Sequence, residues 1–554
     1  MTTPAFMPPL SRPLEQISQR YDVIVVGSGY GGGVAAARLA RAGKRVAVLE
    51  RGREVPTGKF PSRFPEMMKE FRVTGGLVAT GPETALFDVR LGADMHVLVG
   101  RGLGGGSLVN AGVALRPGSR VFADPVWPGQ VGQDGTIEEG FRRAHRWLRP
   151  SLDPSASHMT KFQTLRRASV AVGQPPVPSP VAVTFADTEN PAGISQPGCT
   201  RCGDCCAGCN VGAKNTVALT YLPEAARRGA ELFTHARVEH IEKTPQGAWR
   251  VTVARIDGPR DAPATRIVEA GIVVLAAGTL GSTEILMRSS ARDLAVSERL
   301  GQQFSANGDI IAFGYGMSQP VNAIGVGHPA KADIGEVGAA VTGQIELRPE
   351  GDLDLEINIE EGVLPSALAP VLPVLFVPNG RLLGALQSLV SGVYKGPFSR
   401  LQTYFAVSHD TAAGHLALDK GELRLYWPGA KDEPVFKRLD EVLGKLVAEL
   451  GGAYVKNPLA GSVMGNQPST AHPLGGCAMA LDRTAGVVDH ASRVFTAKPG
   501  SGDTDVHRGL YVIDGSIIPR SLGVNPLLTI TALAERALIH MGDDLGLSMR
   551  DGNA

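Results

Sequence analysis

The chain has 554 residues, 43% of them hydrophobic, which is more than one compact core normally uses, so we expect two sequential or interleaved domains. Its 55 basic and 54 acidic residues leave a net charge of +1, which argues against nucleic acid as a partner and favours a small molecule. Residues 1–22 contain no apolar core of signal-peptide length, and no stretch reaches the roughly 18 apolar residues of a membrane span, so we expect a soluble, cytoplasmic protein.

The first predicted unit is a strand, a glycine-rich turn and a helix. The β-branched run at residues 23–26 is typical of a buried parallel strand, and VAAARLARAG at 34–43 has helical spacing. A second strand, RVAVLE, ends in an acidic residue. Glycines let backbone amides approach a pyrophosphate at the helix N-terminus, and an acid at this spacing accepts hydrogen bonds from ribose hydroxyls. The unit predicts a dinucleotide site formed by Gly27, Gly29, Gly32 and Glu50.

A second glycine cluster, GRGLGGGSLVNAG, occupies residues 100–112. Its glycines permit close backbone approach to a flat or anionic ligand, although an ordinary flexible loop would have the same composition. Two further strand–turn–helix patterns come later in the chain. One turns at Gly278, and the other turns at Asp514 and Gly515 before a helix that follows Pro526.

The chain contains five motifs in this order: the first glycine fingerprint, GRGLGGGSLVN at 100–110, AAGTLGS at 276–282, HPLGGC at 472–477 and DGSIIPRSLGVNP at 514–526. Together they resemble the glucose–methanol–choline (GMC) family of flavoprotein oxidoreductases, and within it the bacterial cholesterol oxidase branch. The similarity spans about residues 20–545. It implies FAD as cofactor and an α/β fold with a Rossmann-like FAD-binding domain and a substrate domain built on a mostly antiparallel sheet. It also implies oxidation of an alcohol by hydride transfer to the flavin N5.

The resemblance further implies how the two domains divide the chain. The FAD-binding domain would take residues 20–115, 199–310 and 460–548, and the substrate-binding domain residues 116–198 and 311–459. Carried over residue by residue, the family motifs place at the cofactor Gly27, Gly29, Gly32, Glu50, Gly102, Gly105, Ser107, Asn110, Val238, Gly278, Asn307, Asp514, Gly515 and Pro526.

The resemblance assigns catalysis to a histidine–asparagine pair at the flavin, matched here by His472 and Asn525. A hydroxyl between them can lose its proton to a base while its carbon delivers hydride. Without the resemblance, the histidine would pass for a buried, hydrogen-bonded residue and the asparagine for a helix cap. In cholesterol oxidases a glutamate on the substrate-domain sheet serves as base. Glu360 matches it best, Glu356 and Glu361 are alternatives, and strand alternation places Glu356 and Glu360 on one face.

The sequence departs from that branch after Pro365, where APVLPVLFVPNGRLLGALQSLVSGVYKGPF is long and apolar. A solvent-facing loop would not be this hydrophobic, so segment 364–400 is either core or a lid over an apolar ligand. We favour the lid, which would also allow peripheral contact with a membrane or a partner. It suits a hydrophobic alcohol, whether sterol, terpenoid or long-chain.

Five of the six cysteines lie in CTRCGDCCAGC, residues 199–209. Their spacing is that of bacterial ferredoxins, apart from Asn210 in place of the usual proline. Structural zinc usually needs two ligand pairs on separate turns, and disulfides need an oxidising compartment. Some flavoprotein glucose dehydrogenases of the family hold an iron–sulfur cluster in this region. We favour such a cluster (4Fe–4S or 3Fe–4S) over disulfides, zinc or free thiols, with the ligands Cys199, Cys202, Cys205 and Cys209.

Together these features predict an FAD-dependent alcohol dehydrogenase that oxidises a hydrophobic alcohol and passes its electrons through the cluster to an external acceptor, such as a redox protein. The alternative is an oxidase of the cholesterol oxidase type, which uses oxygen and keeps the cysteines as structural residues. Further alternatives are a lyase or a photodecarboxylase, both of which occur in the same family, and a non-enzymatic electron carrier. The pair of His472 and Asn525 argues against the photoenzyme and the carrier.

Overall fold

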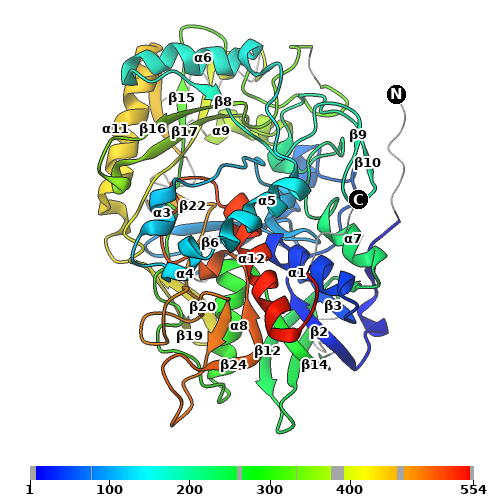
Figure 1. Ribbon diagram of the computed structural model, residues 1–554. Coiled ribbons are helices and arrows are strands. Elements are labelled where there is room, and N and C mark those ends of the chain that lie inside the picture. Colours follow the sequence, from blue (N-terminus) through cyan, green and yellow to red (C-terminus); the bar gives the residue numbers. More distant parts are fainter. Residues whose placement is uncertain are drawn as a thin grey trace.

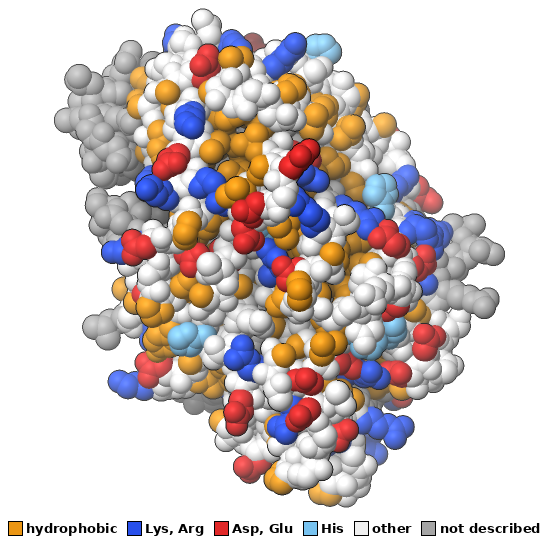
Figure 2. Space-filling view, turned by 60° about the vertical axis from the view of Figure 1, so that its left-hand side comes forward, with side chains coloured by type: hydrophobic (Ala, Val, Ile, Leu, Met, Phe, Trp, Pro, Cys, Tyr) orange, Lys and Arg blue, Asp and Glu red, His pale blue; other side chains and the backbone are white. Residues whose placement is uncertain are grey.

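The computed structural model describes residues 8–76, 78–258, 265–331, 333–375, 392–457 and 467–549. Its two main sheets lie at opposite ends of the molecule, the larger at the bottom of Figure 1 and the smaller at the top. Acidic and basic side chains are intermixed over the face shown in Figure 2, as the nearly balanced charge leads one to expect.

The larger sheet has nine strands in the order β1-β11-β3-β2-β14-β13-β12, with β24 beside β14 and β23 beside β24. The strands from β1 to β14 and β24 are parallel, whereas β12, β13 and β23 run antiparallel to their neighbours. The strands are β1 (Ser11–Arg12), β2 (Arg20–Val26), β3 (Val46–Leu49), β11 (Glu231–Phe233), β12 (Ala236–Lys243), β13 (Trp249–Arg255), β14 (Thr265–Leu275), β23 (Arg493–Phe495) and β24 (Val506–Val512).

The predicted strand–turn–helix units are present in this sheet. β2 leads into α1 (Tyr30–Arg41), β14 into α8 (Gly278–Ser290), and the turn after β24 leads toward α12 (Leu527–Leu545). Helix α1 begins before the predicted residue 34, because a run of glycines lets its first turn pack directly on the strands. A Cβ on Gly31 would lie 1.8 Å from the carbonyl oxygen of Ile513.

The two ends of the chain are tied together by helix packing. Helix α12 packs against α1 and α5 (Thr136–Leu148). Arg38 of α1 and Glu535 of α12 form a buried ion pair of 2.7 Å, and the hydroxyl of Tyr221 in α7 (Tyr221–Arg227) donates to the same carboxylate at 3.0 Å. Segments almost 500 residues apart in the sequence thus form one structural unit.

The smaller sheet is entirely antiparallel, with the order β21-β15-β18-β17-β16-β8. Helices α6 (Thr160–Ala168) and α11 (Pro434–Glu449) pack against it. Its strands are β8 (Val177–Pro178), β15 (Ile310–Tyr315), β16 (Gly343–Leu347), β17 (Ile357–Gly362), β18 (Gln402–Val407) and β21 (Ala453–Lys456).

A third, five-stranded sheet and two small hairpins complete the strands. The sheet has the order β22-β7-β6-β4-β5, and the hairpins are β9–β10 and β19–β20. These strands are β4 (Phe71–Gly75), β5 (Val78–Thr80), β6 (Phe87–Leu91), β7 (His96–Gly100), β9 (Thr188–Glu189), β10 (Ser195–Gln196), β19 (His415–Asp419), β20 (Glu422–Tyr426) and β22 (Ser469–Thr470). The other short helices of the described residues are α2 (Phe64–Met68), α3 (Ser119–Ala123), α4 (Gly129–Gln133) and α9 (Leu372–Leu375).

The predicted lid, 364–400, is described only at its two ends, because residues 376–391 lie outside the described part of the chain. Its first part is a 3₁₀ helix (Ser366–Val371) followed by α9, and its last part is a 3₁₀ helix (Pro397–Arg400). Ala369, Leu372 and Phe398 from the two ends share one hydrophobic cluster. Both ends of the segment are therefore anchored in the interior, and the lid itself stays a prediction.

The predicted fold class is confirmed: a mixed α/β architecture combines a largely parallel, Rossmann-like sheet with an antiparallel sheet. The domain boundaries given above stay a prediction.

Candidate active site and cofactor site

Two glycine-rich segments that lie far apart in the sequence meet at the start of α1. The Oγ of Ser28 accepts a hydrogen bond from the backbone N–H of Gly104 at 2.9 Å. The same hydroxyl lies 2.5 Å from Glu50 Oε2 and 3.2 Å from Gly102 O, so it donates its proton on that side. One small side chain thus joins both glycine segments and the predicted ribose-binding acid.

Glycines, which have no Cβ, let the two segments lie close together. A Cβ on Gly32 would lie 2.0 Å from Gly27 O, and one on Gly105 would lie 2.7 Å from Gly29 Cα. Among the described residues, a Cβ on Gly29 would meet no atom within 4 Å except Gly105 Cα, at 4.0 Å, so space remains in front of the first turn of α1. Backbone N–H groups at such a helix start favour an anion, and this cradle fits the pyrophosphate of FAD.

Glu50 directly follows β3 and is almost completely buried, with 7% of its surface exposed. Its Oε1 accepts from the backbone N–H of Gly52 at 2.7 Å, and its Oε2 accepts from the backbone N–H of Ser28 at 3.1 Å. These donors fix the carboxylate at the carboxyl end of parallel strands, where the ribose of a dinucleotide binds.

The second glycine segment carries one polar atom without a partner. Ser107 Oγ donates to Gly104 O at 2.6 Å and accepts from the backbone N–H of Val217 at 3.0 Å. Asn110 Nδ2 donates to the hydroxyl of Tyr30 at 2.7 Å, whereas its Oδ1 is buried without a donor among the described residues. An unpaired buried amide oxygen costs free energy unless a ligand supplies a donor, so Asn110 also fits a bound cofactor.

Asp514 joins the two later strand–turn–helix units. Its Oδ2 accepts from the backbone N–H of Gly278 at 2.8 Å and from Ser282 Oγ at 2.5 Å, and its Oδ1 accepts from Ser516 N–H and Oγ. The aspartate therefore organises both turns. Direct contact with the cofactor stays a prediction for Val238 in β12, Gly278, Asp514, Gly515 and Pro526, the N-cap of α12.

The three predicted catalytic side chains come from distant segments and lie together. Glu360 is on β17, and its Oε2 accepts from Nδ2 of Asn525, just before α12, at 3.4 Å. Its Oε1 accepts from Nδ2 of Asn358 at 2.9 Å. His472 is close enough for its charge to influence the carboxyl of Glu360. The structure thus brings a carboxyl, an imidazole and an amide to one place, and their catalytic roles stay a prediction.

The pKa of Glu360 lies far above that of an ordinary carboxyl group. Burial, with 1% of its surface exposed, raises the pKa of Glu360 to about 8, although His472 and the amide of Asn525 act in the opposite direction. The Oδ1 of Asn525 is buried without a donor among the described residues. A pKa near the working pH suits a group that exchanges a proton with a substrate, and a substrate hydroxyl would satisfy the unpaired amide oxygen.

Asp309 orients His472. The imidazole Nδ1 lies 3.3 Å from Asp309 Oδ2, which also accepts from the backbone N–H of Ala471 at 2.7 Å. Burial lowers the pKa of His472, but the carboxylates of Asp309 and Glu360 outweigh it, so the pKa is raised overall. With Nδ1 facing Asp309, the Nε2 side of the ring is available to a ligand.

The two competing glutamates have other partners. Glu361 forms a buried ion pair of 2.6 Å with Lys161. Glu356 ends a 3₁₀ turn and pairs with Arg120. Glu356 lies just before β17, which begins at residue 357, so the strand alternation that put Glu356 and Glu360 on one face stays a prediction. Geometry therefore favours Glu360 as the base.

Asn307 holds the turn that carries Asn525. Its Nδ2 donates to Val524 O at 2.9 Å, and its Oδ1 accepts from the backbone N–H of Leu522 at 2.8 Å. Its own backbone is left-handed, with a φ of 58°. Both ends of the amide are thus used by the protein, which supports a positioning role. Direct contact of Asn307 with the cofactor stays a prediction.

Sequence reasoning missed two residues of this site, Ser28 and Asp309. Ser28 stands inside the first glycine fingerprint, and Asp309 lies two residues after Asn307, in the stretch SANGD. Their roles depend on partners more than 70 residues away, Gly104 and Ala471. The acid in SANGD was a usable signal, because a buried carboxylate commonly orients a catalytic histidine.

The cysteine segment lies beside this site. Burial, then the neighbouring Cys205, and more weakly Glu360, raise the pKa of Cys206 to about 12. Burial is also the main cause that raises the pKa of Cys199, and the other three predicted ligands add to it. Backbone N–H groups donate to the sulfur of Cys199 at 3.3 Å, from Arg201, and to that of Cys205 at 3.4 Å, from Ala340.

The thiols do not converge as ligands of one ion. Among the described residues, no three cysteine sulfurs lie within 4.8 Å of one another, which argues against a single zinc ion. All six cysteines are free, so the structure has none of the disulfides considered above. No cluster-like arrangement is present either, and the iron–sulfur cluster stays a prediction.

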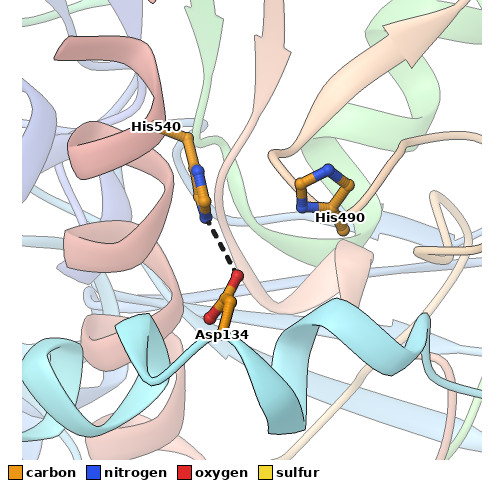
Figure 3. A group of neighbouring side chains, drawn as sticks. All are labelled: Asp134, His490 and His540. Carbon is orange, nitrogen blue, oxygen red and sulfur yellow. Dashed lines mark ion pairs between the residues drawn. The ribbon is translucent and has the colours of Figure 1, made fainter. Parts of the chain in front are cut away.

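A different group of described residues does bring ligand atoms within 4.8 Å: Asp134, His490 and His540, shown in Figure 3. His540 Nε2 lies 3.4 Å from Asp134 Oδ2. The guanidinium of Arg536 donates to the same oxygen at 2.5 Å and lies 3.4 Å from His490 Nδ1. Because this internal cation already balances the carboxylate, the group has no need of a metal ion.

Comparison with known proteins identifies the family. Models of the GMC oxidoreductase family match residues 21–305 and 462–534. The chain belongs to the GMC oxidoreductase family. It is an FAD-dependent oxidoreductase, as the cradle around Gly29 and the carboxylate of Glu50 lead one to expect.

Relatives of this GMC oxidoreductase share most of its length. It is 28% identical to a cholesterol oxidase of Mycobacterium tuberculosis, with 93% of this chain and 90% of that protein covered. It is 26% identical to a cholesterol oxidase of Acinetobacter baumannii (94% of both), and 25% identical to a long-chain-alcohol oxidase of Arabidopsis thaliana (93% of this chain, 66% of that protein). Pyridoxine 4-oxidase from Mesorbium loti has the same fold, with a TM-score of 0.59 and 17% identity over 94% of this chain and 99% of that one.

Within the described part of the chain, none of the helices is both long and apolar enough to span a bilayer.

Proposed function

We propose that this GMC oxidoreductase oxidises the hydroxyl of an apolar alcohol to a carbonyl, with Glu360 as the proton acceptor. The observation that carries the proposal is the buried carboxyl of Glu360, whose pKa is raised to about 8 beside an unpaired amide oxygen and a carboxylate-oriented imidazole. FAD supplies the hydride acceptor when it is bound in the glycine cradle.

The protein's own groups handle the hydroxyl proton. In its ionised form Glu360 can take that proton, while Asn525 Nδ2 stabilises the carboxylate before the transfer. His472, held by Asp309 through Nδ1, presents its other nitrogen to the alcohol oxygen. The carbon releases its hydrogen with two electrons and the oxygen releases a proton, so the alcohol becomes a carbonyl compound.

The substrate class follows from the relatives and from the segment near the site. Two relatives are named cholesterol oxidases and one a long-chain-alcohol oxidase. The anchored ends of segment 364–400 are apolar, with Ala369, Leu372 and Phe398 in one hydrophobic cluster. We therefore propose a sterol, terpenoid or long-chain alcohol, with this segment as its lid.

The proposed electron route uses the cysteine segment. Cys199, Cys202, Cys205 and Cys209 would hold an iron–sulfur cluster, which would pass single electrons to an external acceptor. The ferredoxin spacing and the N–H···S hydrogen bonds to two of these sulfurs support it. The competing proposal is that electrons go to oxygen and the cysteines are structural, as the names of the relatives suggest.

The proposed domain division follows the two main sheets. The strands of the nine-stranded sheet, apart from β1, fall within 20–115, 199–310 and 460–548, and those of the antiparallel sheet fall in the other segments, apart from the first residue of β15. We place the enzyme in the cytoplasm, where iron-bound thiolates are protected from oxidation.

An anaerobic alcohol screen tests the proposed reaction. Purified enzyme is mixed with cholesterol, a terpenoid alcohol, a long-chain alcohol and ethanol, and bleaching of the flavin absorbance is followed. We expect bleaching with an apolar alcohol and much slower bleaching with ethanol. Flavin that stays oxidised with every alcohol would contradict the proposal.

Iron content and oxygen use decide between the two electron routes. Iron and acid-labile sulfide are measured in protein made under iron-replete, anaerobic conditions, and oxygen consumption is followed during turnover. The relay predicts three or four irons per chain, as for 3Fe–4S or 4Fe–4S clusters. Iron-free protein that consumes oxygen with each turnover would establish the oxidase instead.

A further inference from the structure

Asp410 is a buried carboxylate that holds the loop of residues 305–309. It stands three residues after the end of β18, with 9% of its surface exposed. Its Oδ2 accepts from the backbone N–H groups of Ala306 and Gly308, both at 2.9 Å. Its Oδ1 accepts from Ser305 Oγ at 2.8 Å and from the backbone N–H of Ala412 at 3.0 Å. Burial raises the pKa of Asp410, and the same four donors act in the opposite direction.

Loop 305–309 supports both side chains that would flank the substrate hydroxyl. Asn307 holds the turn that carries Asn525, with both ends of its amide. Asp309 faces Nδ1 of His472 at 3.3 Å. One short loop therefore sets the position of the amide and the orientation of the imidazole.

Ser305 transmits the hold of Asp410 along this loop. While its hydroxyl donates to Asp410, the same oxygen accepts from the backbone N–H of Asn307 at 2.9 Å. The backbone of Ser305 pairs with that of Leu474 through two hydrogen bonds of 3.0 and 2.9 Å. Leu474 follows His472 by two residues, so the loop is also fixed to the segment that carries the imidazole.

The position of Asp410 links this loop to the sheet that carries Glu360. Strand β18 pairs with β17, and Phe405 lies directly opposite Glu360. A Cβ on Gly308 would lie 2.7 Å from the carbonyl carbon of Ser408, so the loop rests on the chain between β18 and Asp410. The backbone N–H of Asp410 also donates to Ser521 Oγ at 3.1 Å, in the segment that leads to Asn525.

We infer that Asp410 is a positioning residue of the reaction, which sets His472 and Asn525 in place relative to the sheet that carries Glu360. The inference rests on the proposed function and deepens it, because it concerns the same site. Asp410 acts through loop 305–309 rather than on the substrate. A misplacement of about 1 Å in such a site can slow a reaction about 10²-fold, so Asp410 should affect the rate of the bound alcohol more than its affinity.

The test compares Asp410→Asn with a matched control, Asp489→Asn. In Asp410→Asn an NH₂ group replaces one oxygen and cannot accept from the two donors that faced it. Asp489 is 7% exposed and accepts from the backbone N–H groups of Ala491 and Arg493 at 2.9 Å, in a turn that carries none of the catalytic side chains.

Anaerobic flavin reduction is measured at saturating alcohol and expressed per bound flavin. For Asp410→Asn we expect the rate to fall about 10–100-fold, with a much smaller change in the alcohol concentration that gives half the maximal rate. For Asp489→Asn we expect both quantities to stay close to those of the wild type.

Two further measurements keep the test decisive. The pKa of His472, followed by NMR titration, should fall in Asp410→Asn but not in Asp489→Asn, because Asp309 is held less firmly against the imidazole. Ser305→Ala removes a single hydroxyl from the same network and should slow flavin reduction in the same direction, by less. If Asp410→Asn does not retain FAD, Ser305→Ala decides by the same criterion.

A wild-type rate per bound flavin in Asp410→Asn would overturn the inference, even if the variant were less stable or held less FAD. The proposed proton acceptor fails separately. Slow Asp410→Asn beside a fast Glu360→Gln would support the positioning role and contradict the role of Glu360, and the reverse pattern would do the opposite. If no alcohol reduces the wild-type flavin, the pKa of His472 in Asp410→Asn decides the inference, and an unchanged value would overturn it.

Discussion

Glu360 and Glu361 are neighbours on β17, and both are buried, yet their surroundings differ completely. Glu361 has an ammonium at 2.6 Å and accepts hydrogen bonds from the backbone N–H groups of Thr342 and Gly343 at 2.8 Å. Within the part of the chain that the structure describes, Glu360 has only two amide donors, the farther at 3.4 Å. A carboxylate with a full set of partners stabilises the fold, whereas one with few partners is left free to exchange a proton.

The largest effect that we expect from this difference is on the chemistry at Glu360. Glu360→Gln keeps the shape and the hydrogen bond to Asn525 but cannot accept a proton. We expect anaerobic flavin reduction by the best alcohol to slow about 10²–10⁴-fold, with FAD content unchanged. Stopped-flow absorbance measures the rate. A Glu360→Gln enzyme that reduces its flavin as fast as the wild type would exclude Glu360 as the base.

The complementary effect is on stability at Glu361. Glu361→Gln leaves the ammonium of Lys161 buried without a carboxylate, so we expect the free energy of unfolding to fall by about 3–5 kcal/mol. The double variant Lys161→Met/Glu361→Gln removes both charges and should recover most of the loss. Denaturant unfolding of the three proteins measures it. If Glu361→Gln is as stable as the wild type, the ion pair between Lys161 and Glu361 does not stabilise the fold.

A smaller effect should follow from changing the residue that orients His472. Asp309→Asn removes the carboxylate that raises the pKa of His472, but it keeps the acceptor for the N–H of Ala471. We expect flavin reduction to slow about tenfold, because the ion pair that favours the charged imidazole is lost. The pKa of His472, followed by NMR titration, should fall. An unchanged histidine pKa in this variant would show that the two side chains are not coupled.

Strands and turns of the FAD-binding part were predictable from the sequence, because β-branched runs and glycine motifs report local structure. The start of α1 was not, because glycines carry no hydrophobic periodicity, and close packing against Ile513 is what permits the early first turn. The antiparallel sheet was predicted only through the family resemblance. Its strands pair segments that are far apart, which no local pattern reveals.

The candidate site was predictable in its residue types but not in its electrostatics. The motifs identified His472, Asn525 and Glu360, whereas the raised pKa of Glu360 depends on burial that only the folded chain provides. Charges buried by tertiary packing lie beyond what composition or spacing can indicate.

The pH dependence of anaerobic flavin reduction tests the central claim, that Glu360 accepts the hydroxyl proton, most directly. The carboxyl must be ionised to act as base, so the rate in the wild type should rise with pH through the pKa of about 8 and level off above it. The much slower Glu360→Gln enzyme should lack this rise. A wild-type rate that is flat between pH 6 and 10, or the same rise in Glu360→Gln, would contradict the claim.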